Sequence, residues 1–145
     1  MSQENVEIVR QFQPPPDMDL ALLVRDEDMS TAWIEAAAPF FHADAQCVIH
    51  VIGVESVTHP GVGGLRTAWL DWLTPWASYR SNVERLIDAG EHVVVLVRDF
   101  GRDAPDAPEV EMIAAAVWTV REGKISRVEF FADRAEALKA VGLED

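Results

Sequence analysis

The stretch VEMIAAAVWTVREGKISRVEFF, residues 110–131, decides the fold. It holds two apolar, β-branched runs, 110–120 and 125–131, on either side of a polar turn at 121–124. Runs of this length around a turn that contains glycine are typical of a β-hairpin. Both alternating sets of side chains in the first run are apolar, so we expect that strand to be covered on both faces.

The residues before this hairpin repeat its pattern. Runs 82–87 and 93–100 flank a second turn at 88–91, and a loop rich in Pro and Asp leads on to the first strand of the hairpin. Four strands joined one after another in this way predict an antiparallel meander. After the last strand, Asp133 is placed to cap a short helix over 135–141.

Helical patterns dominate the first half of the chain. Apolar residues at helical spacing predict three short helices, the first running from Ser2 to Phe12 and stopping at Pro14-Pro15-Pro16, the third running through Phe41. Residues 45–52 then predict a buried strand, and 53–64 a loop or a short irregular strand. A long amphipathic helix is predicted over 62–79, with one stripe of large side chains formed by Leu65, Trp69, Trp72 and Trp76.

This order of elements predicts an α+β fold, in which the N-terminal helices and one long helix pack on the concave face of a curved antiparallel sheet. A chain of 145 residues, 49% of them hydrophobic, has the length of one domain, and we assign residues 1–145 to it.

Composition narrows the classes of partner. A net charge of −13 argues against nucleic acid and against anionic membrane surfaces, since both are bound mainly through Lys and Arg. The single cysteine, Cys47, cannot form an intrachain disulfide, which favours a reducing compartment. The first residues lack the basic and apolar segments of a signal peptide, and we expect a cytoplasmic protein.

Three segments carry a resemblance to a known family: SQENVEIVRQF (2–12), HPGVGGLRTAWLDWL (59–73) and AAAVWTVREGKISRVEFFADRAEALKAVGL (114–143). They resemble the nuclear-transport-factor-2-like superfamily, and within it the SnoaL-like, ketosteroid-isomerase-like group. The resemblance implies a cone-shaped sheet. It leaves the activity open, because this fold hosts isomerases, cyclases, dehydratases, epoxide hydrolases and binding proteins.

The acids and the tyrosine used by the isomerase and cyclase relatives align with residues of another kind. The tyrosine position aligns with Phe12, the late-strand acid with Ala116 and the first-strand aspartate with Ile49, and none of these can move a proton. A shift of one residue would bring His50 to the position of the base, where a neutral imidazole could act near pH 7.

The epoxide-hydrolase relatives use an Arg-x-Asp pair on one face of a strand. Here Arg98 and Asp99 are adjacent and should point to opposite faces, and Asp133 lies one position beyond the late acid of that group. The remaining candidates for catalysis are His50, Arg98 and Glu111. Because a buried, unpaired carboxylate is costly, Glu111 either lies near the exposed start of its strand or pairs with an arginine such as Arg98. No histidine pair has the spacing of a metal site, and we expect neither metal nor cofactor.

Aromatic side chains predict an apolar pocket, because the small residues Ala114, Ala115 and Ala116 leave space opposite large rings. The alternative is that these rings simply fill the core. The candidate pocket residues are Phe12, Trp33, Phe41, Ile49, Trp69, Trp72, Trp76, Ala116, Trp118 and Phe131.

Two hypotheses of function follow. In the first, the protein binds a small hydrophobic molecule, and as an enzyme it would be a lyase, isomerase or cyclase that lacks the usual isomerase and cyclase acids. In the second, it is a non-catalytic dimeric binding or scaffold protein. Helices can cover only one face of the strand at 110–120, so we expect a homodimer through the other face of the sheet.

Overall fold

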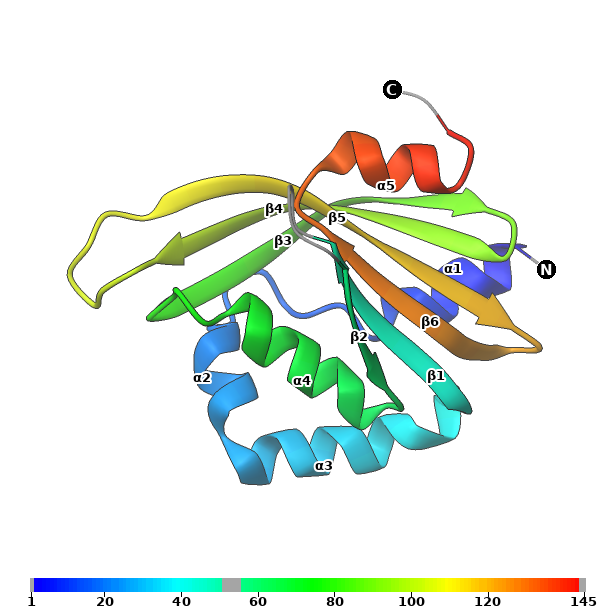
Figure 1. Ribbon diagram of the computed structural model, residues 1–145, viewed down its shortest axis with the longest axis horizontal. Coiled ribbons are helices and arrows are strands. Elements are labelled where there is room, and N and C mark those ends of the chain that lie inside the picture. The colour runs from blue at the N-terminus through cyan, green and yellow to red at the C-terminus, as the bar shows by residue number, and fades with distance from the viewer. Residues whose placement is uncertain (1, 51–55, 144–145) are drawn as a thin grey trace.

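Helices and strands follow one another in the predicted order in the computed structural model, which describes residues 2–50 and 56–143 (Figure 1). The helices are α1 (Ser2–Arg10), α2 (Leu20–Arg25), α3 (Glu27–Ala37), the 3₁₀ helix η1 (Ala38–Phe40), α4 (Gly63–Trp72) and α5 (Arg134–Ala140). The strands are β1 (Phe41–His50), β2 (Val57–Pro60), β3 (Ser78–Ala89), β4 (His92–Arg102), β5 (Val110–Arg121) and β6 (Lys124–Phe131). The predicted α+β class is confirmed.

One sheet contains all six strands, in the order β2-β1-β6-β5-β4-β3. Strands β3 to β6 form the predicted antiparallel meander. Strand β1, however, runs parallel to β6, with Val48 opposite Glu129, so the predicted antiparallel sheet contains one parallel pairing. A helix and four strands connect β1 to β6, and a connection of that length permits parallel pairing where a hairpin does not.

The long helix is shorter than the tryptophan stripe predicts. Helix α4 ends at Trp72, so Trp76 lies in the connection to β3. Pro75 explains the difference, because a proline lacks the amide hydrogen and disfavours helical backbone in the residue before it. Arg25 then closes the turn by donating to the carbonyl oxygens of Leu73 and Trp76, at 2.8 and 2.7 Å.

Other boundaries move by a few residues. Helix α1 ends before Phe12, and the third predicted helix ends in η1, after which Phe41 already belongs to β1. The predicted loop or short strand at 53–64 contains strand β2, while residues 51–55 of these two predictions lie outside the described part of the chain.

The two faces of the sheet are covered by different helices. Helices α2, α3 and α4 lie on one side and α5 lies on the other (Figure 1). Ala137 and Leu138 of α5 form a second apolar cluster with Ala115, Val117 and Phe131 on the outer face. The expectation that helices cover only one face of this strand is therefore wrong, because the short C-terminal helix turns back over the sheet. None of the described helices is long and apolar enough to cross a membrane.

Candidate functional site

A cavity of about 700 Å³ lies between the helices and the concave face of the sheet. Its most exposed lining residues are Gln11, Pro15, Met29 and Ala32, which place the mouth between the end of α1 and helix α3. The deeper wall is mostly apolar and includes Leu20, Leu65, Val95, Val97, Trp118 and Phe130.

Small side chains make room for this cavity. Ala114 and Ala116 on β5 face inward, opposite Val97 and Val95 of β4. Alternate residues of a strand share one face, so both alanines present methyl groups where larger side chains would fill the space. Trp118 continues the same face and stacks on Phe12, with ring centroids 6.0 Å apart.

A buried carboxyl group, Asp99 on β4, lines the cavity. The hydroxyl group of Tyr79 donates to Asp99 Oδ2 at 2.5 Å, and that of Ser81 donates to Oδ1 at 2.6 Å. The indole nitrogen of Trp72 donates to Tyr79 Oη at 2.8 Å. Strand pairing sets this arrangement, because Ser81 of β3 lies directly opposite Asp99. We call these four residues the Asp99 network.

Burial controls the protonation of the network. It raises the pKa of Asp99 above the usual value for an aspartate, while the hydrogen bonds from Ser81 and Tyr79 oppose the rise. Burial and the charge of Asp99 also raise the pKa of Tyr79, so the phenol stays protonated and acts as a donor. The cavity therefore holds a carboxyl group that can bind or release a proton closer to neutral pH than a solvated aspartate would.

Six of the ten candidate pocket residues line the cavity: Phe12, Trp33, Trp69, Trp72, Ala116 and Trp118. The structure brings them together from α3, α4, β5 and the segment after α1.

The other four candidates do not line the cavity. Phe41 and Ile49 belong to the inner apolar cluster. Trp76 packs beside Tyr79, over Gly101, where an added Cβ would come within 2.6 Å of its ring. Phe131 faces the outer side, in the cluster under α5, because it follows Phe130 in a strand whose residues alternate between faces.

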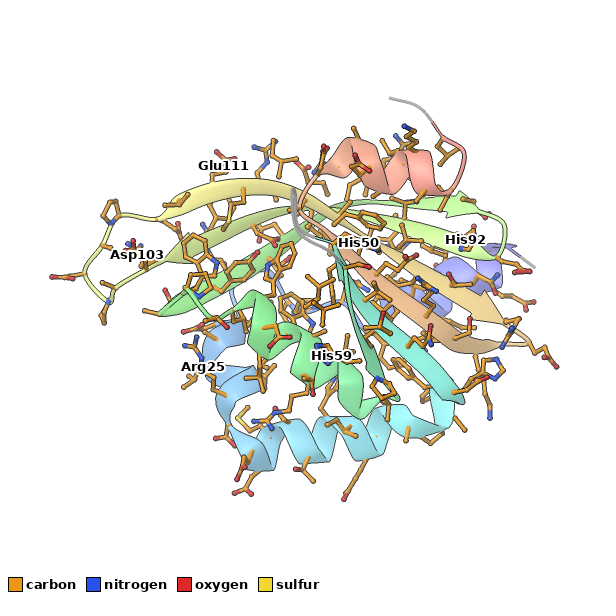
Figure 2. All side chains as sticks on the ribbon, viewed as in Figure 1. Arg25, His50, His59, His92, Asp103 and Glu111 are labelled. Carbon is orange, nitrogen blue, oxygen red and sulfur yellow. The ribbon has the colours of Figure 1, made fainter. Side chains whose placement is uncertain are left out.

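The three candidate catalytic residues lie away from the cavity. Arg98 faces outward, where it forms an ion pair with Glu111 and donates to Glu84. Figure 2 shows Glu111 on the side of the sheet that carries α5. His50 also faces outward, stacked on Phe131, with its Nε2 3.0 Å from Glu129 Oε1. The acid–base set expected from these residues is thus not assembled at the cavity, because each occupies the outward position of its strand.

Sequence reasoning missed Asp99 as a site residue, although it correctly placed Asp99 and Arg98 on opposite faces. A signal was present: Val93, Val95, Val97 and Asp99 alternate along one strand, so a carboxylate follows three inward-facing valines. The two residues that donate hydrogen bonds to Asp99, Tyr79 and Ser81, are likewise two positions apart on the neighbouring strand, so they share one face.

Other ionisable groups form local pairs. His59 on β2 lies 2.8 Å from Asp71 of α4, at a partly exposed position. Within residues 2–50 and 56–143, no three His, Cys, Asp or Glu side chains gather as a metal site would require. Cys47 is buried in the core, and burial raises its pKa to about 12.

Comparison with known proteins agrees with the fold. The model of the SnoaL-like domain family matches residues 26–128. The chain belongs to the SnoaL-like domain family. The matched segment runs from the start of α3 into β6 and so contains α4 and Asp99. The resemblance noted from the sequence is confirmed. No curated protein matches this SnoaL-like chain.

Solved structures of low sequence identity share the architecture. A candidate SnoaL-like polyketide cyclase from Jannaschia sp. CCS1 is 16% identical, with a TM-score of 0.63, over 89% of this chain and 85% of that one. TerC, co-crystallised with polyporic acid, is 18% identical, with a TM-score of 0.59 over 95% and 98%. A nuclear-transport-factor-2-like protein of unknown function from Burkholderia pseudomallei K96243 is 18% identical, with a TM-score of 0.59 over 96% and 98%. These similarities show the fold.

Proposed function

We propose that this SnoaL-like protein binds a planar hydrophobic molecule in its cavity and isomerises or cyclises it, with Asp99 as the group that carries the proton. The observation behind the proposal is one carboxyl group, buried and supported by two hydroxyl groups, in the wall of an otherwise mostly apolar cavity.

The size and the lining of the cavity support a small-molecule ligand. Ligand pockets in proteins typically enclose about 300–1,000 Å³ and combine apolar walls with a few polar groups. The cavity of about 700 Å³ lies within that range. Tryptophan and phenylalanine rings in its wall offer flat surfaces on which a planar ligand can stack.

Asp99 suits proton transfer next to a carbonyl group. In its ionised form, Asp99 would take a proton from the carbon beside a ligand carbonyl, leaving the electron pair on the carbonyl oxygen as an enolate. It would then return the proton to another carbon of the ligand, or to the oxygen formed on ring closure. A raised pKa favours this cycle, because the carboxyl group accepts a proton more readily than a solvated aspartate does.

Two structural relatives also support the proposal. TerC was solved with polyporic acid, and the Jannaschia protein is described as a candidate SnoaL-like polyketide cyclase. At this level of identity they support the choice of a planar, oxygen-bearing ligand for the cavity but assign no substrate.

The test is exchange of a carbon-bound proton. We would incubate the protein with 2-tetralone in deuterated buffer and follow loss of the proton signals next to the carbonyl by NMR. Deuterium incorporation above the buffer rate, lost in Asp99→Asn and kept in Asp103→Asn, would support the proposal. Asp103 is an exposed aspartate that directly follows strand β4 (Figure 2). Equal exchange by parent and Asp99→Asn would contradict it.

One observation favours a binding protein without catalysis. Each oxygen of Asp99 already accepts a hydrogen bond, and the residue is only 3% exposed, as expected of a structural carboxyl group. In that case a ligand would bind equally well to the parent and to Asp99→Asn, with no exchange by either. We also propose a cytoplasmic location, since the single cysteine is a free, buried thiol.

A further inference from the structure

Two charged side chains line the cavity among the residues that the structure describes: Asp99 on the sheet and Arg66 in α4. An arginine there is unexpected, because the remaining lining is apolar or uncharged. Arg66 is half-buried, and withdrawing part of a cation from water beside apolar walls costs free energy unless an acceptor or an anion compensates.

The hydrogen bonds of Arg66 satisfy part of its guanidinium group. Its Nε donates to the carbonyl oxygen of Val24 in α2, at 3.0 Å, which fixes the orientation of the planar group. A guanidinium group carries five N–H donors. Within the described ranges, no carboxylate of the chain forms an ion pair with Arg66. The two terminal nitrogens are therefore available to an anion from outside the chain.

Arg66 and the Asp99 network occupy separate positions along the cavity. Arg66 and Trp72 are both lining residues of α4, and they are six positions apart, which is about 9 Å along the helix axis. Trp72 is the member of the network that reaches Asp99 through Tyr79. The pKa of Asp99 is set by burial, Ser81 and Tyr79, which agrees with a cation too distant to pair with it.

We propose that the ligand is an aromatic carboxylate, held by a two-point contact between its carboxylate and Arg66. This inference rests on the proposed function, in that the ring system would occupy the apolar space between Arg66 and the Asp99 network. Arginine suits this role better than lysine, because its planar donors match both oxygens of a carboxylate.

Two probes that differ in charge test the inference. We would measure the dissociation constants of 2-naphthoate and of its neutral analogue 2-naphthamide at neutral pH, by calorimetry and by quenching of tryptophan fluorescence. The variants are Arg66→Gln, which keeps a donor for the Val24 carbonyl, and Arg66→Lys, which keeps the positive charge but lacks the planar pair of terminal N–H donors. Arg10→Gln is the control, since Arg10 is exposed on α1, lies outside the cavity lining and pairs with Glu7.

The parent should bind the carboxylate about tenfold more tightly than the amide, or better, as expected for a charge-assisted pair of hydrogen bonds. Arg66→Gln should lose that preference while binding the amide as the parent does, and Arg66→Lys should keep only part of it. The control should behave as the parent. Comparison of the two probes on the parent tests the preference for a carboxylate even if Arg66→Gln folds poorly.

Equal binding of both probes by the parent, or an undiminished preference in Arg66→Gln, would overturn the inference and leave the proposed cavity function standing. Binding of neither probe would overturn both. The two failures are thus distinguishable.

Discussion

Tyr79 donates its phenolic hydrogen to Asp99 across 2.5 Å, from one strand to its neighbour, and accepts a hydrogen bond from Trp72 through the same oxygen. One hydroxyl group therefore joins the end of helix α4 to the carboxyl group in the cavity wall. Asp99 is buried and Trp72 is half-buried, so few water molecules can replace this hydroxyl group as a hydrogen-bond partner.

Replacing that hydroxyl tests the network. Tyr79→Phe should lower the free energy of unfolding by about 1–3 kcal/mol, the usual cost of leaving buried polar groups unpaired. The pKa of Asp99 should rise further, because one of the two hydrogen bonds that oppose the effect of burial is removed. Urea denaturation at neutral pH measures the first effect, and carbon-detected NMR titration of the Asp99 carboxyl group measures the second. Unchanged stability would show that the phenol oxygen finds no partner in solution.

Stability should also depend on pH through Asp99. Its pKa is raised in the folded state above the ordinary 3.8, so its contribution is fully present below pH 3.8 and is lost as the pH rises through the raised value. Asp99→Asn cannot ionise, and its free energy of unfolding should fall less than that of the parent as the pH rises above 3.8. Denaturant midpoints between pH 4 and pH 8 measure the difference. The exposed Asp103→Asn should follow the parent, and a parallel course for all three proteins would refute the prediction.

Two neighbouring alanines on β5 allow the cavity to be compared with the packed outer face of the sheet. Ala114 and Ala115 are 4% and 3% exposed, but the first faces the cavity while the second belongs to the cluster under α5. Ala114→Leu should cost less than about 1 kcal/mol and block binding of 2-naphthamide, whereas Ala115→Leu should cost about 1–3 kcal/mol by overpacking. Thermal unfolding and probe titration of both variants measure this. Equal costs would mean that the cavity is closed in solution.

A homodimer remains our proposal for the assembly, although α5 covers part of the outer face. Ile113 of β5 faces outward and is 48% exposed, beside the ion pairs of Arg98. We expect light scattering to give about 32 kDa, twice the chain mass of 16.1 kDa, and Ile113→Glu to shift the protein towards the monomer. A monomeric parent at micromolar concentration would contradict this.

Much of the fold was predictable because alternation and turn residues are local signals. The hairpin at 110–131 and the opposite faces of Arg98 and Asp99 follow from residues close in sequence. The length of α4 was overestimated because its tryptophan spacing continues past Pro75, where the backbone can no longer be helical.

The candidate site was less predictable because its members come from different elements. Asp99 is recognisable as a site residue through its hydrogen bond from Tyr79, 20 residues earlier, which in turn accepts one from Trp72 on a helix. A pattern within one strand shows which way a side chain points but not what it meets. The sequence predicts the short helix α5 but not the face that it covers, since its two buried apolar residues, Ala137 and Leu138, suit either side of a sheet that is apolar on both faces.

The position of β6 between β1 and β5 has a consequence for how the molecule folds. The sheet stays divided until residues 124–131 are in place, because β1 has no other partner that links it to the meander. Closing that contact joins residues 79 positions apart, such as His50 and Glu129, and contacts of such long range slow folding. We therefore expect the cavity to close late in folding. Strands β3, β4 and β5 would pair with one another first, and β6 would then join them to β1.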